Sequence, residues 1–299
     1  MAKNIYTDPA KRQDFMFLFD VTNGNPNGDP DAGNLPRVDP ETMHGMVTDV
    51  AIKRKIRGFI DIHYGAEPGY NIYVQQKGVL SEHHARAQEA IEREDPSVAN
   101  LPKDKKKNSA DLADKRRDWM CRNFYDIRTF GAVLSVTDYP SGQVRGPLQV
   151  TFARSIDPIV PLDISITRVA ITNKDENREQ KVSEMGRKSL TPYALFAAYG
   201  FFSPHFAQAT HFQEQDFERF WEALIYCWDS DHSASRGMMS LRGLYVFTHE
   251  NARGNAPSHE LFSRIQIENT PHARSFQEYS TIINTAALPD GVTLTKLMG

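Results

Sequence analysis

The chain has 299 residues, 40% of them hydrophobic, so it is long enough to bury the core of one elaborated domain or two small ones. Its formal net charge of -3 excludes a uniformly basic protein. No segment has the roughly 18 uninterrupted apolar residues of a membrane span, and residues 1–12 lack the apolar region of a secretory signal. We therefore expect a cytoplasmic protein with no membrane partner.

The first predicted element is a strand at residues 14–21, where apolar residues occupy both alternating faces. This pattern is typical of a central strand that is covered on both sides. A turn-rich loop, NGNPNGDPDAGNLPRVDPET, follows the strand. A helix running to about residue 60 is predicted from apolar residues at helical spacing, namely Met43, Met46, Val47, Val50 and Ala51.

The next segment is predicted to be mainly helical. Residues 71–76 fit a short strand, and residues 80–95 fit a charged helix that ends before a proline. The lysine-rich tract at 102–108 is predicted to be a solvated loop. A second amphipathic helix is expected at residues 109–124, with acidic residues in its first turn.

Strand patterns dominate the middle of the chain. Residues 143–154 and 164–171 both alternate between apolar and polar residues. The polar stretch at 172–189 separates them from an aromatic run at 192–202. This order predicts a protruding hairpin with a hydrophilic tip.

The clearest amphipathic helix covers residues 217–228, and a strand is predicted at 241–248. Strand, helix, several strands, helix and strand is the order of a split β-α-β, ferredoxin-like sheet with large insertions. The expected class is therefore α+β, similar to an enlarged RRM fold. The aromatic RNP1 signature of RNA-binding RRM domains has no match in the sequence.

Positive charge is concentrated in particular segments. Residues 43–60 carry four basic residues and one acidic residue, residues 100–130 nine and five, and residues 142–188 eight and six. Residues 212–299 carry seven basic and eleven acidic residues. Two interpretations stay open: the basic segments converge on one nucleic-acid-binding face, or they only solvate helix surfaces.

The loop after the first strand carries polar side chains that alternate with glycine and proline: Asn23, Asn25, Asn27, Asp29 and Asp31. A calcium loop fails on spacing, because Gly33 and Asn34 are reversed relative to the pattern it needs. We expect no metal or other cofactor. Two alternatives remain, a nuclease that uses Asp29 or Asp31, and a loop that contacts a sugar–phosphate chain.

The predicted helix after this loop carries Lys53 and Arg57 one turn apart, with Arg54 beside them. These residues form a row of cations suited to phosphates. The alternative is that Asp49 pairs with Lys53 at i,i+4 and that the row is only a solvated face.

Three blocks carry a resemblance to a known family. They are the loop and helix at residues 20–60, DIRTFGAVLS at 126–135 and GPLQVTFARSIDP at 146–158. In this order they resemble the CRISPR-associated backbone subunits of the Csd and Csh groups, in the RAMP superfamily, and the composition favours the type I-C branch of the Cascade surveillance complex.

The resemblance implies a hand-shaped subunit with a ferredoxin-like palm, a helical finger insertion and a protruding β-hairpin thumb. The palm would combine residues 13–60, 109–155 and 212–248, the fingers would lie near 61–108, and the thumb near 157–205. The implied partners are guide RNA (crRNA), the target DNA strand paired to it, copies of the chain in a helical filament, a guide-end-capping subunit and a large subunit.

The resemblance also implies the residues that contact RNA and the absence of catalysis. The expected contacts lie in the loop, the first helix and the two later blocks: Asn25, Asn27, Thr48, Lys53, Arg54, Arg57, Arg128, Gly131, Arg145 and Arg154. The working end of the thumb is placed at Met185, Gly186, Arg187 and Lys188. No catalytic residue is expected. The alternative is a metal-dependent ribonuclease that uses the Asp29/Asp31 loop, as in related type III backbone subunits.

Overall fold

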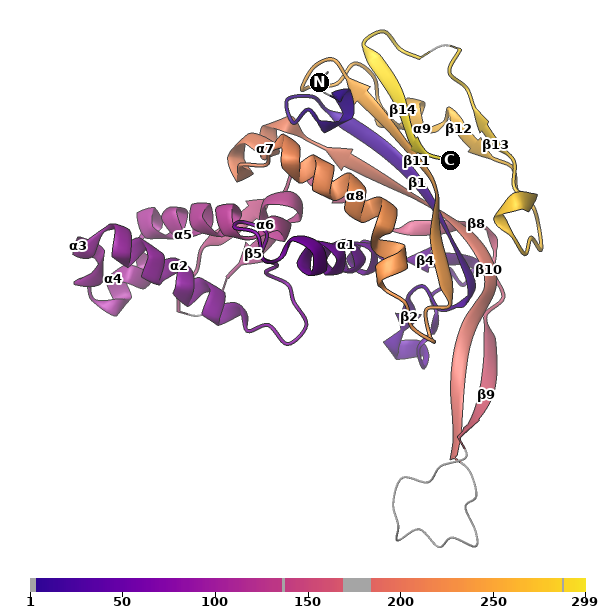
Figure 1. Cartoon of the computed structure of the whole chain (residues 1–299), viewed down its shortest axis with the longest axis horizontal. Helices are drawn as coiled ribbons and strands as arrows, with labels where there is room; N and C mark the ends of the chain where they lie inside the picture. Colours follow the sequence, from indigo (N-terminus) through magenta and orange to yellow (C-terminus); the bar gives the residue numbers. More distant parts are fainter. Residues whose placement is uncertain (1–3, 136–137, 169–183, 287) are drawn as a thin grey trace, which may run out of the picture.

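The computed structural model describes residues 4–135, 138–168, 184–286 and 288–299. A central antiparallel sheet organises this mixed α/β structure (Figure 1). Its strands, in spatial order, are β14 (Val292–Met298), β11 (Met238–His249), β1 (Gln13–Gly24), β10 (Glu184–Phe202), β8 (Ala153–Pro158) and β4 (His44–Val47). Two further strands pair with β10: β7 (Leu148–Val150) and β9 (Leu162–Arg168).

Strand β1 is buried on both faces, as its sequence predicts. Phe15, Phe17 and Phe19 point into the larger core, whereas Met16 and Leu18 point into the second core on the opposite face. Because successive side chains of a strand alternate between faces, a strand between two apolar layers must be apolar at every position.

Two helices cover one face of the sheet, α1 (Asp49–Tyr64) and α8 (Glu214–Ser230) (Figure 1). The predicted helix at 217–228 is confirmed within α8. Its Trp228 is 2% exposed and stacks on Phe19 with 4.5 Å between ring centroids. Burial of such rings supplies a large part of the stability of this layer.

Short elements of the C-terminal segment cover the opposite face: α9 (Ser258–Phe262), β12 (Ile265–Ile267), η3 (Phe276–Glu278) and β13 (Thr281–Ile283). Strand β14 extends the sheet beside β11. The sequence patterns do not predict any of these elements. The N-terminal 3-10 helix η1 is Ile5–Thr7.

The predicted start of the first helix is wrong. Residues 44–47 form strand β4, which pairs with β8, and Met43 has a left-handed φ of 57°. The helix begins only after Thr48, whose Oγ1 accepts a hydrogen bond from Ala51 N. Met46 and Val47 fit helical spacing and strand alternation equally well, and pairing with β8 decides between the two.

The helical insertion contains α2 (Leu80–Glu94), α3 (Pro96–Ala99), α4 (Lys103–Asn108), α5 (Ala110–Asn123) and α6 (Tyr125–Phe130). The helices predicted at 80–95 and 109–124 are confirmed. The lysine-rich tract forms the short helix α4 and is not a loop. Residues 71–76 are not a strand; only Asn71 makes an isolated bridge, to Phe124.

The predicted strand at 143–154 is broken into three pieces, β6 (Gly142–Arg145), β7 and the beginning of β8. Strand β6 leaves the central sheet and pairs with β5 (Gly131–Leu134). Gly146-Pro147 separates β6 from β7, and Phe152 is 54% exposed although it shares the alternating pattern with the buried Leu148 and Val150. The single alternating pattern is therefore divided among three strands, because its parts pair with different partners.

Strands β9 and β10 form the predicted protruding hairpin (Figure 1). Residues 185–188 lie within β10 and pair with Thr167 to Ile164 of β9. Of the predicted hydrophilic stretch at 172–189, residues 172–183 lie outside the described residues and the rest belongs to β10. Within the described part of the chain, no helix is long and apolar enough to cross a membrane.

Candidate nucleic-acid interface

Side-chain amides of the loop between β1 and β4 form hydrogen bonds within the loop and to the start of α1. It contains β2 (Gly28–Asp29), η2 (Pro30–Ala32) and β3 (Leu35–Pro36). Asn25 is 6% exposed and donates to Asn34 O at 2.7 Å, while Asn27 Oδ1 accepts from Thr48 N at 2.9 Å. The Thr48 side chain also has a partner within the protein, because its Oγ1 caps α1. Of these three predicted contact residues, Asn27 and Thr48 position the start of α1, and Asn25 stabilises the loop.

Asp29 also has partners within the loop. One carboxylate oxygen accepts from Asp31 N at 3.2 Å, and the other lies 3.5 Å from the Arg37 guanidinium. The Asp31 side chain is exposed. This geometry is that of an Asx-type turn with an ion pair.

The three predicted cations of α1 do not form one row. Lys53 and Arg57 share a helix face and lie 5.5 and 5.4 Å from the centroid of the Phe130 ring. Arg54 has no contact with the Phe130 ring and lines a second groove of about 600 Å³, which Arg57 also lines. Positions i and i+4 share a face of a helix, whereas i+1 is rotated about 100° away.

Both cations beside Phe130 also have acidic partners. Lys53 pairs with Asp49 at 2.9 Å, as the alternative interpretation of the sequence predicts, and reaches Gln149 Oε1 at 3.3 Å. Arg57 pairs with Asp126 at 2.8 Å. The Arg57 side chain is 14% exposed and that of Asp126 is 1% exposed, so this pair is largely desolvated.

Arg128 lies inside the protein. Its guanidinium donates two hydrogen bonds to Asp216 Oδ1, at 2.7 and 3.0 Å, and lies over the Tyr70 and Tyr125 rings. Burial opposes its charge, but hydrogen bonding and the charge of Asp216 outweigh this effect and raise its pKa. Because the residue is 5% exposed, its side chain joins the helical insertion to α8 and does not reach the surface.

Position 131 requires a glycine because other parts of the protein backbone approach it closely. Its φ of 79° and ψ of 168° are open to glycine, and a Cβ there would lie 2.4 Å from Val144 O and 2.5 Å from Gly146 N. This close approach joins the end of α6 to the β5–β6 hairpin. It therefore determines where Phe130 and Arg145 lie.

Arg145 and Arg154 are both exposed, but they lie in different surroundings. Arg145 lies over the Phe206 ring, 4.6 Å from its centroid, beside α7 (Pro204–Thr210). Arg154 is 60% exposed and pairs with Asp39 of the loop at 3.1 Å. Surface pairs of this kind contribute little to stability, so phosphates can compete for the guanidinium.

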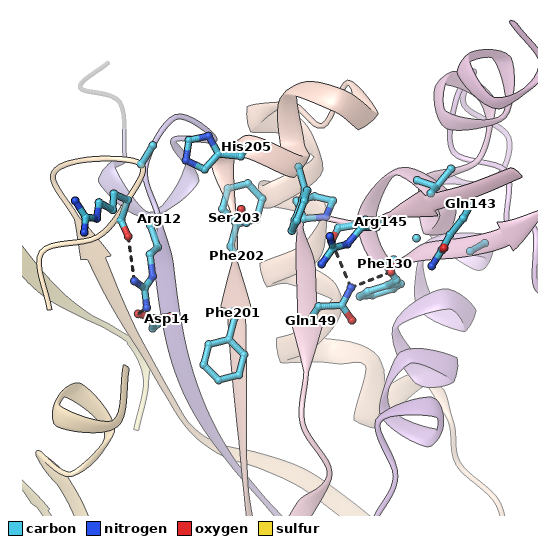
Figure 2. A pocket seen from close by; sticks show the side chains of 18 of the residues that line it. Arg12, Asp14, Phe130, Gln143, Arg145, Gln149, Phe201, Phe202, Ser203 and His205 are labelled. Atoms are coloured by element: carbon cyan, nitrogen blue, oxygen red, sulfur yellow. Dashed lines mark hydrogen bonds and ion pairs between the residues drawn. The ribbon is translucent and has the colours of Figure 1, made fainter. Parts of the chain in front are cut away.

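A groove of about 720 Å³ lies where the insertion meets the end of the central sheet (Figure 2). Phe130, Gly131, Arg145 and Gln149 line one side of it. The structure thus brings four of the predicted contact residues together around Phe130 and Gln149: Lys53, Arg57, Gly131 and Arg145. Other predicted contact residues lie elsewhere: Asn25, Asn27, Arg54, Arg128 and Arg154.

Several groove residues are missed by the sequence analysis, namely Arg12, Phe201, His205, Phe206 and Arg253. They come from separate segments that meet only in the folded chain. The one local signal is Arg253, a basic residue in the turn-rich segment NARGNAP.

Comparison with known proteins decides the family. A model of the family "CRISPR-associated protein Cas7" matches residues 11–284. The chain belongs to the Cas7 family. This membership confirms the resemblance carried by the three sequence blocks at the level of the Cas7 family.

A curated Cas7 relative from Haloferax volcanii is 25% identical over 232 residues, which are 71% of this chain and 64% of the relative. The match therefore spans less than two thirds of that Cas7 protein. A chain of a structure titled "CRISPR RNA-guided surveillance complex, pre-nicking" has 14% identity and a TM-score of 0.52, covering 79% of this chain and 78% of that one. Another, titled "CRISPR RNA-guided surveillance complex", has 16% identity, a TM-score of 0.45 and coverages of 79% and 68%.

Proposed function

We propose that this Cas7-family chain is a noncatalytic backbone subunit that binds guide RNA in a type I CRISPR surveillance complex, of the I-C branch. The observation that carries the proposal is the convergence of Lys53 and Arg57 on Phe130, with Lys53 also reaching Gln149. Phe130 and Gln149 line a groove that also contains Arg145. Cations gathered along a groove suit a sugar–phosphate chain.

The division into palm, fingers and thumb is part of the proposal. Strand order β11-β1-β10-β8, with α1 after β1 and α8 after β10, supports a ferredoxin-like palm. Helices α2 to α5 would be the fingers and the β9–β10 hairpin the thumb. Relative to the predicted boundaries, the proposal moves α5 from the palm to the fingers, and it keeps β9 and β10 within the thumb at 157–205.

The partners follow from the same proposal. Phosphate contacts carry no sequence information, so a subunit of this kind accepts any guide, and base pairing with the target DNA strand supplies specificity. Further copies of the chain in a helical filament, a guide-end-capping subunit and a large subunit would complete the complex.

The binding test uses Lys53→Ala and Arg54→Ala, singly and together, with fluorescence anisotropy of labelled single-stranded RNA. We expect Lys53→Ala to weaken binding equally for unrelated sequences and to reduce the salt slope by about 0.7. Arg54→Ala should change little if only the Phe130 side of α1 contacts RNA. Arg57→Ala is unsuitable, because it would leave the buried Asp126 carboxylate without its cation.

An unchanged affinity and salt slope in Lys53→Ala would show that α1 is not part of the interface. Lys103→Ala serves as the matched control, since Lys103 is 70% exposed and lies on α4, away from the groove. Its loss should leave binding unchanged.

The absence of catalysis has its own test. The pairing of Asp29 with Asp31 N and Arg37 favours a structural loop. We expect no cleavage when the assembled complex is incubated with labelled target RNA and Mg²⁺. Cleavage that Asp29→Ala abolishes would instead support the alternative metal-dependent ribonuclease.

A further inference from the structure

A partly exposed aromatic ring lies at the centre of the groove in Figure 2, on the sheet itself. Phe201 of β10 pairs with Asp14 of β1 on one side and with Gln149 of β7 on the other. Directly paired residues project to the same face of a sheet, so these three form a row across its end. Phe201 is the apolar member of this row.

Arginines lie on both sides of the row. Arg145 stands on the side of the insertion, whereas Arg12 stands on the side of the N-terminus of β1 (Figure 2). Arg253 also lines the groove, and its carbonyl oxygen accepts a hydrogen bond from Arg12 Nη1 at 3.1 Å. Arg12 is held in place by Asp14 at 3.0 Å and by Ser258 Oγ at 2.7 Å. The side chains of Arg145 and Arg253 are exposed.

The charge of the acidic member of the row, Asp14, is offset by Arg12, so the charges of Arg145 and Arg253 remain. Asp14 is fully buried and accepts from both Arg12 and His249. His249 Nδ1 accepts from Asn255 N, so its Nε2 carries the proton that is donated to Asp14. The groove therefore keeps the positive charge of Arg145 and Arg253 beside an aromatic surface, while Arg12 is paired with its one carboxylate.

An aromatic face between cations fits an unpaired nucleotide, because the ring can stack on a base while the cations bind the phosphates on either side. A base in a duplex cannot reach such a ring without leaving its stack. We propose that this groove binds single-stranded RNA with one base stacked on Phe201 and the flanking phosphates at Arg145 and Arg253. The inference rests on the proposed function and extends the interface from α1 onto the sheet.

The test measures the binding of full-length chain to unstructured oligouridine by anisotropy at several salt concentrations. Phe201→Leu keeps an apolar side chain against Phe262 but removes the stacking surface. We expect it to weaken binding about 5- to 100-fold without changing the salt slope. Arg145→Gln and Arg253→Gln should each reduce the slope by about 0.7. Arg93→Gln, on α2 with its side chain 80% exposed, is the matched control and should change neither quantity.

Photocrosslinking provides a second measurement that does not depend on variant stability. Oligouridine that contains thiouridine should crosslink to wild-type chain at or beside residue 201, as mapped by mass spectrometry. Normal binding by Phe201→Leu together with crosslinks confined to other surfaces would overturn the inference while the proposed function stands. Failure of wild-type chain to bind any single-stranded RNA would overturn both.

Discussion

Arg128→Ala is expected to lower the free energy of unfolding by about 3–5 kcal/mol, because it leaves the Asp216 carboxylate buried without its cation. The Asp216 side chain is 3% exposed and keeps only its bond from Gln213 N at the start of α8. The variant also removes the hydrogen bond that Arg128 donates to Gly69 O. Urea denaturation followed by circular dichroism measures the change.

The same experiment separates two roles for Arg128. If it were an RNA contact, as the family resemblance implies, Arg128→Ala would have wild-type stability and reduced affinity for RNA. Arg122→Ala is the matched control, since Arg122 is 64% exposed and pairs with Asp118 at the surface. It should change the free energy of unfolding by no more than about 0.5 kcal/mol.

Gly131→Ala is expected to lower the free energy of unfolding by about 3 kcal/mol or more, because the strain of this backbone conformation in a residue other than glycine is alone worth about 1–3 kcal/mol. The added Cβ would also overlap Val144 O and Gly146 N, and backbone atoms cannot rotate away as a side chain does. Relief requires the β5–β6 hairpin to move away from α6. Such a movement would displace Phe130 and Arg145, so RNA affinity should fall together with stability.

Gly33→Ala provides the comparison. Gly33 also has a positive φ, 63°, but a Cβ there would meet nothing within 4 Å. Its replacement should cost only the left-handed backbone penalty of about 1–2 kcal/mol. Should Gly131→Ala prove as stable as Gly33→Ala while losing RNA affinity, the glycine would serve the approach of RNA rather than the packing of the protein.

The reliable sequence predictions depend on local apolar patterns. Strand β1 and helix α8 were predictable because one continuous segment of each carries the complete pattern of a doubly covered strand or an amphipathic helix. Strand β4 was mistaken for the start of a helix because four residues are too few to separate the two periods. Its pairing with β8, more than a hundred residues away, decides the outcome.

In the candidate site too, local sequence patterns predict some features, whereas contacts between distant residues decide others. Lys53 and Arg57 were predictable as neighbours, because their spacing on one helix brings them together whatever else the chain does. The burial of Arg128 away from the candidate site was not predictable, since its partner Asp216 is distant in sequence. An isolated arginine in a sequence carries no sign of whether its guanidinium will be solvated or paired inside.

The sequence by itself indicated the family, through three short blocks, and determined the main buried strand and helices, through local periodicity. Only the tertiary structure decided which cations face a common groove and that Phe201 lies between them. These residues come from the N-terminus, the helical insertion, β10 and the C-terminal segment. Their meeting depends on long-range strand pairing and burial, whose free energy is set by the whole fold and leaves no mark on any one segment.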